Sequence, residues 1–402
     1  MPRSKFKSWN ILDSGLTERL NGHHHWENKA FVDELLRRGE TVRLFSYVQA
    51  PGAEQFSGIP VVPLFSLFLY QGISDDPTWA TLENFVVHTR AFSSDLAKLD
   101  SALFQDSIAV FPTVGESHLL GIFRWLSTSP SENGPKAAIC LMPSFQWSKD
   151  EHGMGLYGTV WKDCPPELRK RVALFARTPL IAEIFAKQAN LPVRVFPYPV
   201  LEDLVTARPP LDKTRSGPMI VSFVGGERKA RGAELIADVV KRCSGMGVQF
   251  FIQARHGGDT DIDRSALAAL SGLPYVSVHE GALERSDYYR AIAESVVLLP
   301  YDPSQYRWRD SGIYHEAQCL DAPVLVSAGT FMADEVKRAG NGLIIEDLSV
   351  AGVVDCIARA QRDLPALKAA AVRVGKEARE GSGVARCIDA LAAPFSGSDV
   401  NG

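Results

Sequence analysis

Short apolar runs alternate with amphipathic segments along most of this chain. Apolar runs that end on turn residues predict buried strands, and apolar positions recurring every three or four residues predict helices. In the first half the pattern predicts strands at residues 6–11, 41–45, 59–62, 107–112, 137–142, 174–176 and 193–196, with helices at 28–38, 78–104 and 179–188.

The alternation restarts after a proline-rich stretch, residues 197–218, which is the best candidate for a linker. Strands are predicted at 219–224, 248–253, 276–278, 296–300, 324–326 and 342–345, with helices at 233–242, 286–294 and 350–379. Strand–helix alternation builds doubly wound parallel sheets. We therefore predict an α/β protein with two Rossmann-like domains facing each other across a cleft: residues 1–200, a linker at 201–217, residues 218–385, and a C-terminal tail at 386–402.

Composition narrows the class of protein. A chain of 402 residues exceeds the size at which one core usually stops growing, and a net charge of -4 predicts no general attraction to nucleic acid. The six cysteines are scattered without a CxxC pair, which favours a reducing compartment over a disulfide framework. No signal peptide or membrane-spanning run is evident. We expect a cytoplasmic protein with at most a peripheral contact with the membrane.

The stretch from Tyr301 to Ser327 carries the strongest candidate chemistry. It reads as a strand end, a polar loop, a helix and a second buried strand. Ser311 and Gly312 open the helix, so unpaired backbone N–H groups and the positive end of the helix dipole are offered to an anion such as a phosphate. Glu316, one turn further on, could accept hydrogen bonds from sugar hydroxyls; the alternative is a surface glutamate favoured by the dipole.

A basic loop follows the first strand of the second half. Gly225 and Gly226 would let a ligand approach the backbone, and Arg228 and Arg231 follow them. Guanidinium groups bind phosphate oxygens bidentately and keep their charge, so this pair could clamp a diphosphate in place of a metal ion. The alternative is a solvated basic patch, and Lys229 could take the place of either arginine.

Candidate catalytic residues of the first half follow the strand at 107–112. Thr113, Glu116 and His118 lie where a cleft would be, and Glu116 could act there as a general base. A packed structural histidine is the alternative for His118. The adjacent histidines 23–25 are poor metal ligands, because neighbouring side chains do not converge on one ion, and no metal or cofactor is expected.

Four features of the second half, in this order along the chain, resemble the group 1 glycosyltransferases of the GT-B fold. They are the proline-rich linker entry at 196–200, the glycine loop with its basic residues at 223–232, the segment 281–300, and the segment from Ser311 through Glu316 to Val324. Together they span roughly residues 196 to 347. The first half resembles the family more loosely, mainly through Gly22.

The resemblance implies a mostly retaining transfer of a sugar from a nucleotide donor, most simply a UDP- or GDP-sugar, to an acceptor hydroxyl in glycan, polysaccharide or glycoconjugate biosynthesis. It implies an acceptor-binding first domain and a donor-binding second domain. In the family a residue of the loop after the strand at 107–112, often a histidine, contacts the transferred sugar, and His118 could take that role. The acceptor would be a saccharide, a lipid-linked saccharide or a small molecule. The implied donor-binding residues are Gly22, Gly225, Gly226, Arg228, Arg231, Arg309, Ser311, Gly312 and Glu316.

One position departs from the family. A glutamate that contacts the donor sugar usually stands eight residues before the one matched by Glu316, and here that position is Trp308. Arg307, Arg309 or Asp310 could compensate. The substitution leaves the sugar and the retaining outcome unspecified, and the sequence does not give the nucleotide base, the acceptor or the oligomeric state.

Two other functions remain open at this point. A non-catalytic, nucleotide-binding partner subunit of a true transferase would bind a nucleoside diphosphate without turnover. A nucleotide-sugar epimerase of the same fold would change the donor alone into an isomer. A nicotinamide dehydrogenase is least favoured, because no G-x-G-x-x-G follows either first strand.

Overall fold

The computed structural model describes residues 6–18, 23–69, 82–129, 133–142, 152–196, 198–199, 204, 217–256, 266–267, 269–381 and 383–396. The chain divides into two compact units. The first is Met1–Leu201 together with Gly383–Gly402, and the second is Glu202–Ser382.

The first unit is built on a parallel sheet with the strand order β3-β2-β1-β4-β5-β6-β7. Its strands are β1 (Trp9–Asp13), β2 (Val42–Tyr47), β3 (Val61–Phe65), β4 (Ile108–Val114), β5 (Lys136–Leu141), β6 (Val172–Ala176) and β7 (Val193–Val195). The order reverses between β1 and β4, so loops from their carboxyl ends diverge there and leave room for ligands.

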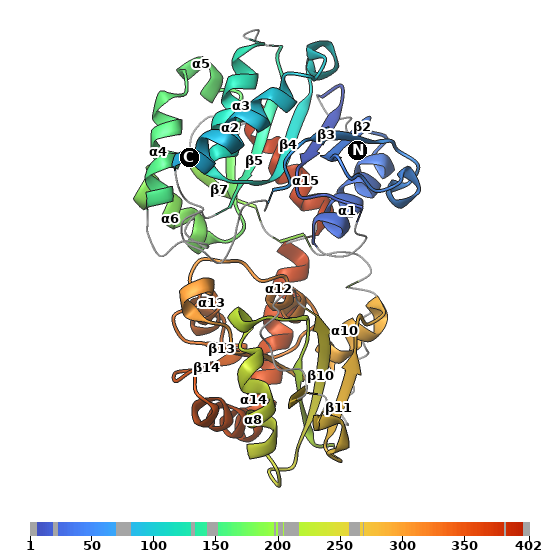
Figure 1. The fold of residues 1–402 in the computed structure, drawn as a ribbon, viewed down its shortest axis with the longest axis vertical. Coiled ribbons are helices and arrows are strands. Elements are labelled where there is room, and N and C mark those ends of the chain that lie inside the picture. The colour runs from blue at the N-terminus through green and yellow to red at the C-terminus, as the bar shows by residue number, and fades with distance from the viewer. Residues whose placement is uncertain are drawn as a thin grey trace. The chain divides into compact units, whose positions relative to one another are not determined.

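Helices cover both faces of this sheet (Figure 1). The helices are α1 (His23–Arg37), α2 (Leu82–Leu96), α3 (Glu116–Ser127), α4 (His152–Asp163), α5 (Pro166–Arg169), α6 (Pro179–Ala189) and α15 (Val384–Ala392). α1 and α15 pack on one face through Phe31, Val32 and Ile388. Phe92 of α2 and Trp125 of α3 stack against strand residues on the other. Burial on both faces explains why the strands read as continuous apolar runs.

The second unit repeats this plan. Its parallel sheet has the order β11-β10-β8-β12-β13-β14, with the short β9 (Gly226–Glu227) paired to β10. The other strands are β8 (Met219–Phe223), β10 (Val248–His256), β11 (Val276–Glu280), β12 (Val296–Leu299), β13 (Val324–Ser327) and β14 (Gly342–Ile345). The order again reverses at the first strand of the unit, between β8 and β12.

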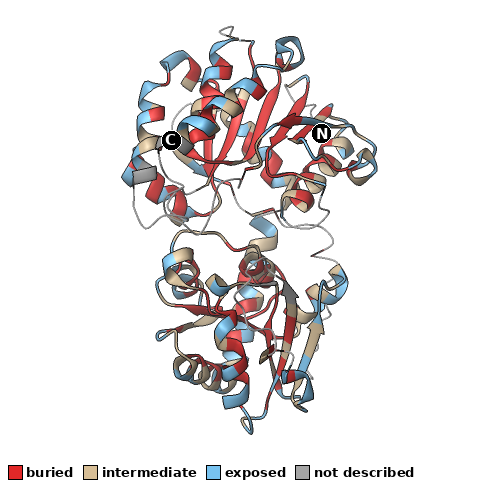
Figure 2. Cartoon of the chain, in the orientation of Figure 1, coloured by how far each residue is buried: buried red, intermediate tan, exposed pale blue. Residues whose placement is uncertain are grey.

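Helices of the second unit are α8 (Ala233–Arg242), α10 (Arg285–Ala293), α11 (Pro303–Tyr306), α12 (Gly312–Cys319), α13 (Phe331–Ala339) and α14 (Val350–Gly381). α8 and α14 share one buried cluster with the strands. Figure 2 shows buried residues along the strands of each unit and exposed residues on the outer sides of the helices. The predicted α/β architecture of two Rossmann-like domains is confirmed.

The histidine run is placed differently from the prediction. The sequence pattern puts residues 23–25 in a loop and starts the helix near Asn28, whereas α1 begins at His23. Histidine has weak helix propensity, so the pattern shows no helix start there. Tertiary contacts supply it: His25 is buried against Phe56, and the side chain of Asn28 bonds Asp13.

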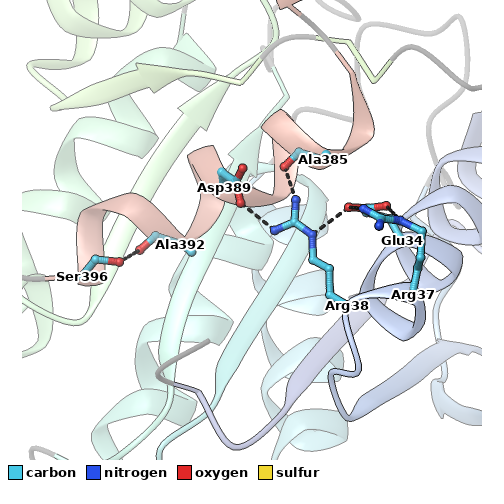
Figure 3. A network of polar contacts seen from close by, with 7 residues as sticks. All are labelled: Glu34, Arg37, Arg38, Ala385, Asp389, Ala392 and Ser396. Atoms are coloured by element: carbon cyan, nitrogen blue, oxygen red, sulfur yellow. Dashed lines mark hydrogen bonds and ion pairs between the residues drawn. The ribbon is translucent and has the colours of Figure 1, made fainter. Parts of the chain in front are cut away.

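The chain returns to the first unit at its C-terminal end. The sequence pattern leaves residues 386–402 as a tail, but α15 buries Cys387, Ile388 and Leu391 in the first core, beside α1 (Figure 1). Arg38, which directly follows α1, donates to the carboxylate of Asp389 at 2.6 Å and to the carbonyl of Ala385 at 2.8 Å (Figure 3). Val384, Ile388 and Leu391 recur at helical spacing, so the sequence carries the period of α15, but the period does not say which core the helix joins.

Arg38→Ala should loosen α15. We expect a loss of about 1 kcal/mol in the free energy of unfolding, because the Asp389 carboxylate is mostly exposed and water screens the pair. Arg37→Ala is the matched control, because Arg37 is the neighbouring arginine and also pairs with Glu34. Hydrogen exchange of the α15 amides should accelerate in Arg38→Ala alone; equal exchange in both variants would contradict this role.

The Leu- and Phe-rich segment 63–73 contributes to the core where the structure describes it. Leu64, Phe65 and Leu69 are buried, and residues 70–73 lie outside the described ranges. None of the helices in the described ranges is both long enough and apolar enough to cross a bilayer.

Candidate functional site

The candidate site of the second unit lies beyond the carboxyl ends of β8, β10 and β12. The loop after β8, which runs through residues 228–232, is hydrogen-bonded to the segment after β12. The Asp302 N–H donates to the Ala230 carbonyl at 2.9 Å. Gly232 has φ +74°, and a Cβ there would lie 2.2 Å from the Pro300 carbonyl oxygen. Only glycine therefore allows the two segments to approach so closely.

Arg231 is held between two tyrosine side chains. Its Nε donates to the Tyr306 hydroxyl at 3.3 Å, and its guanidinium lies 5.8 Å from the centre of the Tyr301 ring. Arg231 forms no ion pair with any carboxylate among the described residues. A cation that is largely removed from water without an anionic partner is unusual, because buried charges are normally paired.

The Tyr301 hydroxyl lies in the same place. The residue is 1% exposed, and its Oη, which the Ser311 side chain adjoins, forms no hydrogen bond of good geometry within the described part of the chain. Burial raises the pKa of Tyr301 to about 12, although Arg231 opposes the rise, so the group stays an O–H donor. A buried donor without a partner next to an uncompensated guanidinium indicates a site for an anion.

The first turn of α12 adjoins this arginine. A Cβ on Gly225, which has φ +99°, would lie 2.8 Å from Arg231 Nη1 and 2.7 Å from Ile313 Cδ1. The glycine loop, Arg231 and the start of α12 are therefore brought together, as the sequence predicts. Ser311 caps α12, its hydroxyl accepting from the Tyr314 N–H at 3.4 Å.

Asp310 and its neighbours shape the loop before α12. The Asp310 carboxylate accepts from the Ser311 N–H at 2.8 Å and lies 2.7 Å from His315 Nε2. Asp310 is therefore engaged in holding the helix start. The guanidinium carbon of Arg307 lies 4.8 Å from the centre of the Trp308 ring, and that of Arg309 lies 5.1 Å from the centre of the Tyr306 ring.

Glu316 is bonded to a tyrosine of α10. The Tyr288 hydroxyl donates to Glu316 Oε2 at 2.7 Å. Burial raises the pKa of Glu316 to about 7, and the Tyr288 bond opposes that rise by stabilising the carboxylate. This carboxyl group therefore changes charge near neutral pH.

Gln253 is a site residue that sequence reasoning missed. Its side chain is 2% exposed; Oε1 accepts from the Gly225 N–H at 2.9 Å, and Nε2 donates to the Gly281 carbonyl at 3.0 Å. It therefore joins the glycine loop to the turn after β11. The signal that could have found it is a polar residue directly after the apolar run Phe250–Ile252 of β10.

The predicted residues of the first unit lie at the carboxyl end of β4. Thr113 is inside β4, and Glu116 and His118 are in the first turn of α3. Burial raises the pKa of Glu116 to about 7 and lowers that of His118 to about 3. His118 Nδ1 accepts from the Gly115 N–H at 3.2 Å, so its neutral imidazole caps the helix.

His118 also packs edge to face with Phe92, with ring centres 4.7 Å apart and an angle of 75° between the rings. These contacts favour the packed structural alternative for His118, and its catalytic assignment stays a prediction. Gly22 lies outside the described residues, so its assignment to the donor site also stays a prediction.

Comparison with known proteins gives matches in structure alone. Neither a protein-family model nor a curated protein sequence matches the chain. Its structure is similar to a glycosyltransferase from Rickettsia africae (9% identity, TM-score 0.65, 98% of this chain and 100% of that one). It is also similar to HepE from Anabaena, solved in complex with UDP (12% identity, TM-score 0.64, 97% and 99%).

A putative UDP-N-acetylglucosamine 2-epimerase from Listeria monocytogenes is a further match (14% identity, TM-score 0.58, 98% of each chain). Identities this low establish the fold and not the activity. The fold and its two parallel sheets place this chain among proteins of the GT-B fold.

Proposed function

We propose that this protein transfers a sugar from a nucleotide-diphosphate-sugar donor to an acceptor hydroxyl. The observation that carries the proposal is Arg231, an arginine without a carboxylate partner, beside the unpaired Tyr301 hydroxyl and the start of α12. Two donors and a helix N-terminus converge there, which suits the two phosphoryl groups of a nucleoside diphosphate. HepE, of the same fold, was solved with UDP, which makes a UDP-sugar the first donor to test.

Charge development explains why such a site would catalyse transfer. When the bond between the anomeric carbon and the phosphate breaks, negative charge grows on the departing diphosphate. Preorganised donors that meet this charge lower the barrier more than they stabilise the bound donor. We propose that Arg231, with Arg228, supplies this stabilisation in the absence of a metal ion, and that Glu316 binds the ribose hydroxyls.

The class of acceptor and the cytoplasmic location stay predictions. Retention in the resembling family goes with a glutamate that Trp308 replaces here. We therefore do not carry retention over to this chain. The epimerase alternative keeps some support from the Listeria structure, whose fold is the same.

A donor screen tests the proposal. The full-length protein is incubated with UDP-, GDP-, ADP- and dTDP-sugars, with and without EDTA, while each nucleoside diphosphate is titrated in a thermal-shift assay. We expect one diphosphate to raise Tm, since a ligand at 100 times its Kd stabilises by about 2.7 kcal/mol. Slow donor hydrolysis with that nucleotide, unaffected by EDTA, would support a metal-independent transferase.

The same screen separates the alternatives. Conversion of the donor into an isomer without release of nucleoside diphosphate would identify an epimerase. Binding without any turnover, across all donors and a panel of saccharide acceptors, would identify a non-catalytic subunit. No thermal shift with any diphosphate would contradict the site itself.

A further inference from the structure

Two arginines of the second unit lie against the same buried phenol. Arg231 Nε donates to the Tyr306 hydroxyl at 3.3 Å, and the guanidinium carbon of Arg309 lies 5.1 Å from the centre of the Tyr306 ring. Tyr306 is 2% exposed and packs against Tyr301, with ring centres 4.4 Å apart. Arg231 comes from the loop after β8, and Arg309 comes from the loop between α11 and α12. The fold therefore gathers two guanidinium groups from separate loops at one point, although like charges repel.

The electrostatic potential at Tyr306 is strongly positive. Burial raises the pKa of Tyr306, but Arg231, Arg309 and Arg228 outweigh burial, so this pKa is lowered. Each phosphoryl group of a nucleotide sugar carries a single negative charge, so Arg228 and Arg231 match the charge of the diphosphate. Arg309 brings a further cation to the same place, which indicates a further anionic group in the ligand.

The loop that carries Arg309 is held at both ends by its own carboxylates. Asp302 caps α11, and its side chain accepts from the Ser304 N–H at 2.8 Å. Asp310 accepts from the Ser311 N–H at 2.8 Å, directly before α12. These contacts fix the backbone on either side of Arg309, so its side chain starts from a defined position.

The covalent order of the donor places its sugar relative to this loop. With Glu316 on the ribose and Arg231 on the diphosphate, the sugar follows the diphosphate on the side away from the ribose. Glu316 lies one turn inside α12, whereas Trp308 and Arg309 precede the start of that helix. The sugar therefore lies on the side of the helix start that carries Arg309.

We propose that the sugar of the donor carries a carboxylate, so that the donor is a nucleotide-activated uronic acid, and that Arg309 binds this carboxylate. This substrate class rests on the transferase function proposed above. A planar guanidinium binds a carboxylate through two parallel N–H···O bonds, and the Tyr306 ring beside Arg309 orients the guanidinium group.

A neutral sugar would fit these charges less well. Its hydroxyl groups would not offset the repulsion between Arg309 and Arg231, whereas a carboxylate does. Trp308, next to Arg309 in the chain, adds an aromatic ring without a negative charge, and a glutamate in its place would repel the carboxylate of a uronic acid. The charges of the loop therefore favour an anionic sugar.

Donor pairs that differ only at C6 test this substrate class. The full-length protein is titrated by calorimetry with UDP-glucose and UDP-glucuronate, and with the galactose and mannose pairs on the base found in the donor screen. We expect the wild-type protein to bind one uronate about tenfold or more tightly than its neutral counterpart, because an ion pair with a bidentate arginine is added. The kcat/KM for transfer should show the same preference.

Arg309→Gln should remove this preference. The two Kd values of the pair should then agree within about threefold, and the Kd for the free nucleoside diphosphate should stay within about threefold of wild type. The unchanged Kd for the diphosphate shows that the variant is folded. Arg309→Lys keeps the charge without the planar fork and should keep part of the preference. Arg242→Gln, at the exposed end of α8, is the matched control and should keep all of it.

Three results would overturn this assignment alone. They are equal or weaker binding of every uronate beside a neutral donor that is transferred, a preference that survives in Arg309→Gln, and a loss of nucleoside diphosphate affinity in Arg309→Gln with an unchanged preference. The last result would make Arg309 part of the diphosphate site. A wild-type protein that binds no nucleoside diphosphate and no donor would overturn the proposed function as well.

Discussion

Replacing Arg231 by alanine should lower kcat/KM for the donor about 100-fold or more. A guanidinium that forms two charge-assisted hydrogen bonds to a diphosphate contributes about 3 kcal/mol, and each 1.4 kcal/mol is tenfold. Arg231→Lys should recover only part of the loss, since an ammonium keeps the charge but lacks the planar fork. The proposed role in leaving-group departure places most of the loss in kcat.

The same substitution should not lower the stability of the unliganded protein. Arg231 lies beside Tyr301 and Tyr306 without a carboxylate partner, so only contacts with neutral tyrosine side chains offset its desolvation in the unliganded protein. We expect Arg231→Ala to unfold at the same denaturant concentration as wild type or at a higher one. Binding sites often hold groups that cost stability until the ligand arrives.

Arg242→Ala is the control for this experiment. Arg242 ends α8, the helix that follows the basic loop, and is exposed. Arg242→Ala should change neither kcat/KM for the donor nor the denaturant concentration at which the protein unfolds. Lower stability in Arg231→Ala with unchanged kcat/KM would show that the arginine is structural and would contradict the site.

The local sequence pattern predicts most of the helices and strands, and tertiary contacts stabilise the elements that the pattern does not predict. The sequence pattern predicts α8 and β14 at their observed bounds. The apolar positions of each segment have a clear period, and each segment ends at a clear stop signal. α4 was not predicted: its sequence HGMGLYGTVWKD contains three glycines, which weaken helix propensity. The buried Tyr157, whose hydroxyl donates to the Val114 carbonyl at 2.9 Å, anchors it.

The residues of the candidate site also fall into two groups, those that the sequence pattern predicts and those that only the fold brings together. Arg231, Ser311 and Glu316 can be found from sequence because each stands in a local context with its own physical signature, a glycine loop or a helix start. Gln253 and Tyr288 owe their roles to partners 28 residues away in the chain, which no periodic pattern reveals.

The pairing of Asp13 with His24 is also invisible in the sequence. The histidines read as a polar run in a loop, and an aspartate that closes a strand is commonplace. Only the fold brings the ring of His24 over Gly15 and within 2.8 Å of the carboxylate.

Glu316→Gln should abolish a pH dependence of nucleotide affinity. Ribose hydroxyls donate most strongly to an ionised carboxylate, and the Glu316 pKa of about 7 leaves it mainly protonated at lower pH. Below that pKa, the affinity of wild type for the nucleoside diphosphate should fall up to about tenfold per pH unit relative to Glu316→Gln. The phosphate titrates in both experiments, so the difference between the variants isolates Glu316.

Stability provides an independent check with a defined sign. The folded-state pKa of Glu316 lies above its ordinary value of 4.5, so its contribution to the free energy of unfolding is complete below about pH 4.5 and is lost as pH rises through about 7. Glu316→Gln should therefore match wild type at about pH 4 and exceed it by about 3 kcal/mol at about pH 8.5. Chemical denaturation at the two pH values measures this.

Tyr288→Phe tests the cause of the shift. The Tyr288 hydroxyl donates to Glu316 at 2.7 Å and holds its pKa below the value that burial alone would give. Its removal should move the midpoint of the affinity profile to higher pH. A midpoint that stays in place or falls would mean that the tyrosine does not govern this carboxyl group, and a wild-type profile identical to that of Glu316→Gln would remove Glu316 from the ribose site.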